Sequence, residues 1–142
     1  MYTTFQCSPS ALPVPKHVLV AEDDTELRRL LVCELSRDGH LVSSISDGGE
    51  LLDYLRGSAL EGGFQIIPDL LVCDVRMPVW NGTDALELIR ALGWRFPVIL
   101  ISAFADEELH RFGAARGATV IGKPFDFDEL RARVIEDLQR TI

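Results

Sequence analysis

The segment L-L-V-C-D-V-R-M-P-V-W-N-G, residues 70–82, is the most informative stretch of the sequence. Its dense run of Leu, Val and Cys predicts a strand buried on both faces, as in a parallel sheet. The run ends in one carboxylate, Asp74, and the chain then turns at Met77-Pro78 and again at Asn81-Gly82. Open α/β sheets bind their ligands at the carboxyl ends of the strands. Asp74 is therefore either a functional carboxylate or simply the first residue of a turn.

The same two patterns, a short apolar run and a helical spacing of apolar residues, alternate along the whole chain. The apolar runs predict strands at 17–21, 40–45, 69–74, 97–101 and 119–121. The helical patterns predict helices from residue 24 or 25 to Gly39, from 47 to a long loop at 57–68, and at 83–92, 106–116 and 128–140. Five β-α units predict an α/β fold, a single doubly wound five-stranded parallel sheet with right-handed crossovers and helices on both faces.

Composition limits the kind of protein and its surroundings. The chain has 142 residues, 47% of them hydrophobic and 25% charged, which predicts one soluble domain. A proline-containing stretch at 1–15 is expected to be a flexible arm, which leaves 16–142 for the domain. A net charge of −8 disfavours direct binding of nucleic acid, and no apolar run is long enough for membrane insertion.

The cysteines and the N-terminus point to the compartment. Cys7, Cys33 and Cys73 match no zinc or disulfide spacing, and the last two lie in apolar runs and are expected in the core. We see no signal-peptide pattern, and therefore expect a reducing cytoplasmic location.

Polar groups follow four of the predicted strands. Glu22-Asp23 follow the first, Asp74 the third, Ser102 the fourth and Lys123 the fifth. Because parallel strands end at one edge, the three carboxylates would repel one another there unless cations neutralise them. Lys123 supplies one positive charge, and a hard divalent cation such as Mg²⁺ would supply the rest. The set suits phosphoryl transfer onto Asp74, with Ser102 and Lys123 free to bind the new phosphoryl oxygens.

Each of these residues also has an ordinary structural explanation. Acidic clusters before a helix are usually caps, a serine after a strand is usually a turn residue, and a lysine before proline is usually solvated. The combination is specific because each residue follows its own strand.

At this point the chain resembles the receiver domains of bacterial response regulators in two-component signalling, over about residues 16–140. The motifs that carry the resemblance are V-L-V-A-E-D-D-T-E-L-R, the segment 70–82, V-I-L-I-S-A and I-G-K-P-F. The resemblance implies a flavodoxin-like strand order 2-1-3-4-5 and transfer of phosphate from a phosphohistidine to Asp74 with Mg²⁺. The donor would be a sensor histidine kinase or, in a phosphorelay, a histidine phosphotransfer protein.

The resemblance also assigns the metal ligands. The family's first-helix arginine matches Arg28, so its acidic pair matches Glu22 and Asp23, and Asp24 is left to start the helix. Asp23 would bind Mg²⁺ directly and Glu22 through water. Asp74, the phosphoacceptor, would be a further ligand, together with the main-chain carbonyl of Arg76.

Two residues toward the end of the chain complete the implied site. Ser102 matches the hydroxyl switch residue and Lys123 the lysine that contacts phosphate and carboxylate, with a cis bond expected before Pro124. The family often has Tyr or Phe three residues before the lysine, whereas this chain has Val120. The aromatic switch of the family is therefore not expected here.

The predicted role is a signalling module rather than an enzyme, and its output would run through contact with an unknown downstream protein. The sequence leaves dimerisation through the last helices open. An aspartyl-phosphate hydrolase would need a second Asp at the position of Arg76, and a flavodoxin-like cofactor binder would need a Ser/Thr/Gly-rich loop after the first strand. A degenerate receiver that only binds partners is disfavoured by the full set of acids, Ser102 and Lys123.

Overall fold

The computed structural model describes residues 15–60 and 67–140, in which five strands and five helices alternate. The strands are β1 (His17–Ala21), β2 (Leu41–Ile45), β3 (Leu70–Asp74), β4 (Val98–Ser102) and β5 (Ala118–Gly122). The helices are α1 (Thr25–Ser36), α2 (Gly48–Leu60), α3 (Gly82–Ala91), α4 (Glu107–Ala115) and α5 (Phe127–Arg140). The predicted β-α order is confirmed.

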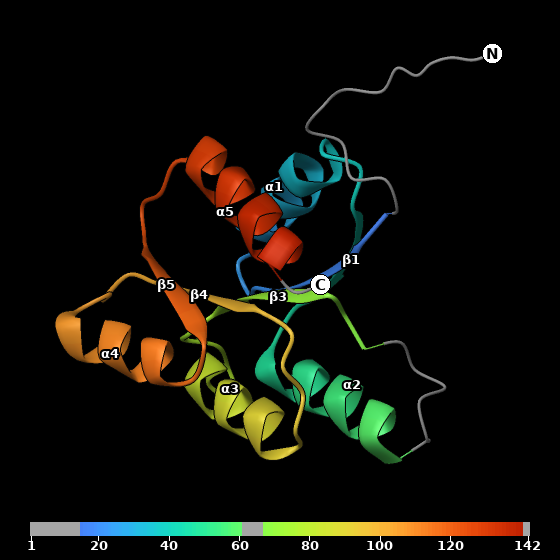
Figure 1. Ribbon diagram of the computed structural model, residues 1–142, viewed down its shortest axis with the longest axis vertical. Helices are drawn as coiled ribbons and strands as arrows, with labels where there is room; N and C mark the ends of the chain where they lie inside the picture. Colours follow the sequence, from blue (N-terminus) through green and yellow to red (C-terminus); the bar gives the residue numbers. More distant parts are fainter. Residues whose placement is uncertain (1–14, 61–66, 141–142) are drawn as a thin grey trace.

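All five strands are parallel and lie in the order β2-β1-β3-β4-β5, which confirms the doubly wound sheet. Helices α1 and α5 cover one face, and α2, α3 and α4 cover the other (Figure 1). In the register of the central strands, Ala21 lies beside Cys73 and Asp74 beside Ile101. The carboxyl ends of β1, β3 and β4 therefore meet at one edge of the sheet.

Alternate residues of the central strands belong to two different cores. Leu71 and Cys73 pack among residues of α2 and α3, whereas Leu70 and Val72 pack among residues of α1 and α5. All residues of β3 and β4 are buried, because helices cover both faces of these strands. This packing fixes the position of Asp74, the last residue of β3.

The ends of α1 have the expected residues. Asp24 is the N-cap, and its carboxylate accepts a hydrogen bond from the Leu27 N–H. Gly39 follows the helix with φ of 89°, a conformation that glycine adopts without steric cost. The assignment of Asp24 to the helix start is thus confirmed.

Three expectations from the sequence need comment. Helix α2 continues to Leu60, so the first four residues of the loop expected at 57–68 are helical, because one glycine inside a helix costs only about 1 kcal/mol. Cys33 is exposed rather than buried, whereas Cys73 is buried as expected. The remainder of that loop from 61 to 66, and the arm at 1–15 except Pro15, lie outside the described residues.

Among residues 15–60 and 67–140, no helix has the length and apolar character needed to cross a membrane.

Candidate phosphoacceptor and metal site

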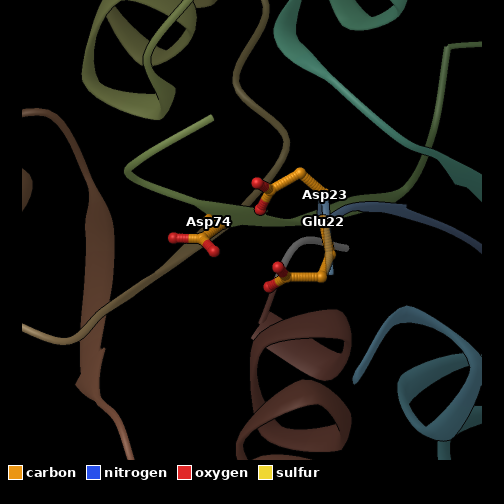
Figure 2. Close-up of side chains that lie close together, drawn as sticks. All are labelled: Glu22, Asp23 and Asp74. Atoms are coloured by element: carbon orange, nitrogen blue, oxygen red, sulfur yellow. The ribbon is translucent and has the colours of Figure 1, made fainter. Parts of the chain in front are cut away.

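Three carboxyl groups gather at the edge where β1 and β3 end. Glu22 and Asp23 directly follow β1, and Asp74 is the last residue of β3. One oxygen from each of these side chains lies within 4.8 Å of the others, and Figure 2 shows the three carboxyl groups close together. Two strands that are separated in the sequence by α1, β2 and α2 thus bring three acids into one small volume.

Lys123 brings a positive charge to this cluster from the loop after β5. Its Nζ lies 2.7 Å from Oδ2 of Asp74 and 3.5 Å from Oε1 of Glu22. Burial alone would lower the pKa of Lys123, but the hydrogen bond and the charge of Asp74 raise it above its ordinary value. The lysine is therefore a charged partner of the Asp74 carboxylate.

Glu22 is the most deeply buried of the three acids, with only 1% of its surface exposed. Its Oε2 accepts the Asp24 N–H at 3.0 Å, and Arg28 donates to its main-chain carbonyl at 2.8 Å. Its Oε1 has no hydrogen-bond partner among the described residues. Burial, opposed by the Asp24 N–H and reinforced by the charge of Asp74, raises the pKa of Glu22 to about 7.

The two neighbouring aspartates have different roles. Asp24 is occupied as the α1 cap, whereas Asp23 is exposed and lines a groove of about 510 Å³ together with Arg76 and Asn81. This groove gives solvent access to the acidic cluster from the side of the loop that follows β3.

The cluster fits a hard divalent cation. Carboxylate oxygens are the ligands that Mg²⁺ prefers, and the site leaves open positions for water because Asp23 faces a groove. Glu22 Oε1 is buried without a hydrogen bond, and the negative charge exceeds what Lys123 neutralises. A cation here would relieve both conditions. The residue expected to give a main-chain ligand, Arg76, lines the same groove.

Close packing holds the loop from Val75 to Asn81 in place. The Gly82 N–H donates to the Val75 carbonyl, and a Cβ at Gly82 would stand 2.5 Å from the Asp74 carbonyl oxygen. A Cβ at Gly48 would likewise overlap the main chain of Trp80. These two glycines let α3 and α2 approach the loop, so the groove is bounded by rigid helix starts.

The hydroxyl of Ser102 lies at the end of β4, almost completely buried. Its Oγ accepts the Phe104 N–H at 2.9 Å, and its main-chain carbonyl accepts the Lys123 N–H at 2.8 Å. The Phe104 ring is stacked against Arg76, with the guanidinium carbon 5.2 Å from the ring centre. The bond between Lys123 and Pro124 is cis, as expected.

Sequence reasoning missed Asn81 as part of the site. It is the N-cap of α3, but its side chain makes no capping hydrogen bond and lines the groove beside Asp23. The sequence contained no signal for this role, since an Asn before a helix is ordinarily assigned to capping. Nothing local in the sequence tells a capping side chain from one that faces a groove.

Comparisons with known proteins agree with this geometry. The family model described as "Response regulator receiver domain" matches residues 18–135. Two curated relatives are the alkaline phosphatase synthesis transcriptional regulatory protein SphR of Synechococcus elongatus and the two-component response regulator PhoP of Pseudomonas aeruginosa. SphR is 34% identical over 94% of this chain and PhoP 33% identical over 87%, and in both cases the match covers 52% of the relative. The chain thus spans about half the length of these relatives.

Solved structures give the same result for the fold. The receiver domain of the Francisella response regulator 1452 superposes with a TM-score of 0.79 at 29% identity, over 89% of this chain and 99% of that one. The chemotaxis response regulator CheY4 of Vibrio cholerae superposes with a TM-score of 0.72 at 23% identity, over 87% and 99% of the two chains.

Proposed function

Since the chain belongs to the response-regulator receiver domains, we propose that Asp74 accepts a phosphoryl group from a phosphohistidine of a sensor histidine kinase or a histidine phosphotransfer protein. The observation that carries the proposal is the contact of 2.7 Å between Lys123 Nζ and the Asp74 carboxylate beside two further acids. Receiver domains are signalling modules, and the matched family is not an enzyme family.

In the proposed step, a carboxylate oxygen of Asp74 attacks the phosphorus of the donor. A P–O bond forms while the P–N bond breaks, and the imidazole nitrogen keeps the electron pair of that bond. A donor imidazole protonated at its other nitrogen then leaves in its neutral form. Lys123 neutralises charge on the new phosphoryl oxygens, and the Ser102 hydroxyl donates a hydrogen bond to one of them. Later hydrolysis of the acyl phosphate by water resets the site.

Glu22, Asp23, Asp74 and the carbonyl of Arg76 are the residues that would hold Mg²⁺, which supplies neutralisation of the phosphoryl oxygens during transfer. The buried Oε1 of Glu22, which makes no hydrogen bond among the described residues, supports this assignment. Glu22 acts through water in the proposal, because its carboxylate is buried, whereas Asp23 is exposed and lines the groove.

The output is proposed to run through protein contact. SphR is named a transcriptional regulatory protein, and this chain matches about half of its length. The net charge of −8 makes direct contact with nucleic acid by this domain unfavourable. The phosphorylated domain would therefore act on a downstream protein, on a second copy, or on a region outside this chain.

The test is phosphorylation by acetyl phosphate, a small donor that needs no partner protein. With Mg²⁺ present, the chain is expected to gain one phosphoryl group that is stable in acid and labile in base. Asp74→Asn is expected to abolish this gain. The matched control is Asp84→Asn, which changes an exposed aspartate in the first turn of α3. Failure of the wild type to gain the group, or an undiminished gain in Asp74→Asn, contradicts the proposal.

A further inference from the structure

The residue of β5 at the position where receivers often have an aromatic side chain is tightly packed in this protein. Val120 is buried, and its Cγ2 lies 3.0 Å from the place that a Cβ on Gly113 of α4 would take. A β-branched side chain has restricted χ1 freedom, and here α4 packs directly against it. Val120 has neither the size nor the space to swing between two positions.

A large aromatic side chain stands instead next to the hydroxyl at the end of β4. Phe104 is 67% exposed, which is unusual for a phenyl ring. Its main-chain N–H donates to Ser102 Oγ at 2.9 Å, and its ring lies 5.2 Å from the guanidinium carbon of Arg76. Arg76 in turn donates its main-chain N–H to Asp74 Oδ1 at 3.2 Å. The exposed ring is thus linked to Asp74 through Arg76, and its main chain is linked to the Ser102 hydroxyl at the end of the neighbouring strand.

We propose that Phe104 reports the phosphorylation of Asp74, in place of an aromatic residue on β5. The inference rests on the proposed function, because it requires a phosphoryl group on Asp74. A Ser102 hydroxyl that turns to donate to a phosphoryl oxygen moves Oγ away from the position in which it accepts the Phe104 N–H. The same phosphoryl group attracts the Arg76 guanidinium away from the ring, because a charge-assisted hydrogen bond is stronger than a solvent-exposed stacking contact.

The structure contains a place for the released ring. An open hollow of about 330 Å³ lies between the start of α3 and α4, and Phe104 and Ser102 are among the residues that line it, together with the polar side chains of Thr83, Asp106 and Glu108. Its apolar lining comes from Val75, Leu109 and Phe112. A phenyl ring that moves from solvent into this hollow gains apolar burial and an aromatic neighbour. The movement changes the exposed surface at the N-terminal end of α4, which is where a partner would detect it.

The experiment follows the Phe104 ring and the phosphoryl group separately. All seven phenylalanines are replaced by 4-fluorophenylalanine, and the fluorine NMR signal of Phe104 is assigned by its loss in Phe104→Leu. Acetyl phosphate and Mg²⁺ are added, and the phosphorylated fraction is measured by intact mass. The Phe104 signal is expected to move in proportion to that fraction, while the signal of Phe96, at the opposite end of the sheet, stays in place.

Two variants test the two contacts. In Ser102→Ala the Phe104 signal, read only on the phosphorylated fraction, is expected to lose most of its movement. In Arg76→Gln the signal of the unphosphorylated protein is expected to lie already closer to the phosphorylated position, because one of the two outward contacts is gone.

The outcomes separate this inference from the proposed function. A wild type that gains the phosphoryl group while the Phe104 signal stays unmoved overturns the inference alone. The same movement in phosphorylated Ser102→Ala also overturns it, because the movement would then be independent of the hydroxyl. If the wild type gains no phosphoryl group, the proposed function fails, and the inference fails with it.

Discussion

The charged side chains at the two ends of the sheet differ in how completely the protein provides their hydrogen-bond partners. At the amino end, the Arg90 guanidinium donates to the main-chain carbonyls of Arg116, Trp94, Phe96 and Gly117, at 2.7, 2.8, 2.9 and 3.4 Å. At the carboxyl end, Glu22, Asp23 and Asp74 crowd around Lys123, and one Glu22 oxygen has no hydrogen bond among the described residues.

The difference is between a charge whose hydrogen bonds are made within the fold and a cluster whose charges are not fully paired. The protein itself completes the coordination of Arg90, so this residue ties the α3–β4 and α4–β5 connections together. In the acidic cluster, by contrast, Glu22 Oε1 is left without a hydrogen bond, and a cation from solution is the partner that the proposed function would supply. Buried polar groups without partners cost free energy, and proteins keep them where a ligand supplies the missing interaction.

The largest effect is expected from removing the structural charge. Arg90→Met keeps the length of the side chain but leaves the carbonyls at the amino end without their donors. We expect a loss of about 3 kcal/mol in the free energy of unfolding, measured by urea denaturation. The control is Arg95→Met, an exposed neighbour, with a change within about 0.5 kcal/mol. Similar losses in both variants would mean that Arg90 is not the structural counterpart of the acidic cluster.

At the carboxyl end, we expect a variant whose stability relative to the wild type increases as the pH rises. The pKa of Glu22 is raised from 4.5 to about 7, so the folded state holds its proton more tightly than the unfolded state. This contribution to stability is therefore complete below about pH 4.5 and is lost as the pH rises through 7. Without divalent cations, the stability of Glu22→Gln relative to wild type is expected to rise by about 2 kcal/mol between pH 5 and pH 8.

Urea denaturation of both proteins in EDTA at the two pH values measures this change, and subtracting the wild type cancels other titrating groups. A difference that does not depend on pH would show that Glu22 is already ionised at low cost.

A smaller effect is expected when Mg²⁺ fills the acidic cluster. At a free concentration tenfold above its dissociation constant, a cation that binds only the folded state stabilises it by about 1.4 kcal/mol. Thermal unfolding of the wild type should therefore shift upward with Mg²⁺ and return on chelation. Asp23→Asn should lose the shift and Asp84→Asn should keep it. An equal shift in both variants would place the ion elsewhere.

The smallest effect is expected for His40, a buried histidine at the amino end of the sheet. Burial, opposed by the charge of Asp38, lowers the pKa of His40 below 6.5, so the unfolded state takes up a proton more readily. The contribution of His40 to stability is present above pH 6.5 and falls as the pH decreases below it. His40→Leu should flatten this part of the pH profile in urea denaturation. An unchanged profile would mean that His40 is protonated in the folded state as easily as in the unfolded one.

The sequence predicted the part of the fold that depends on local patterns. Strand positions agree with the apolar runs to within two residues, because the runs end where the chain leaves the covered part of the sheet. The prediction that Cys33 lies in the core was wrong, and helix geometry explains why. Leu31 and Leu35 are four residues apart and share the buried face of α1, whereas Cys33 lies two residues from each, on the opposite side.

The sequence predicted which charged residues meet at one edge of the sheet, but not how the loops around them are arranged. That Asp74, Glu22 and Lys123 meet follows from the topology, since all three come at strand ends. The stacking of Phe104 on Arg76 depends on the conformations of two loops far apart in the sequence. No pattern within either loop contains that information.

The close contact between Gly48 and Trp80 has a practical consequence. Trp80 belongs to the loop that borders the groove beside Asp23, and its partial burial against the core gives the indole a defined environment. Trp94, the second tryptophan, lies at the other end of the sheet, in the connection between α3 and β4. The molecule thus carries an optical probe next to its acidic cluster and a reference probe far from it. Tryptophan emission, resolved with one Trp→Phe variant of each, can follow ion binding without any added label.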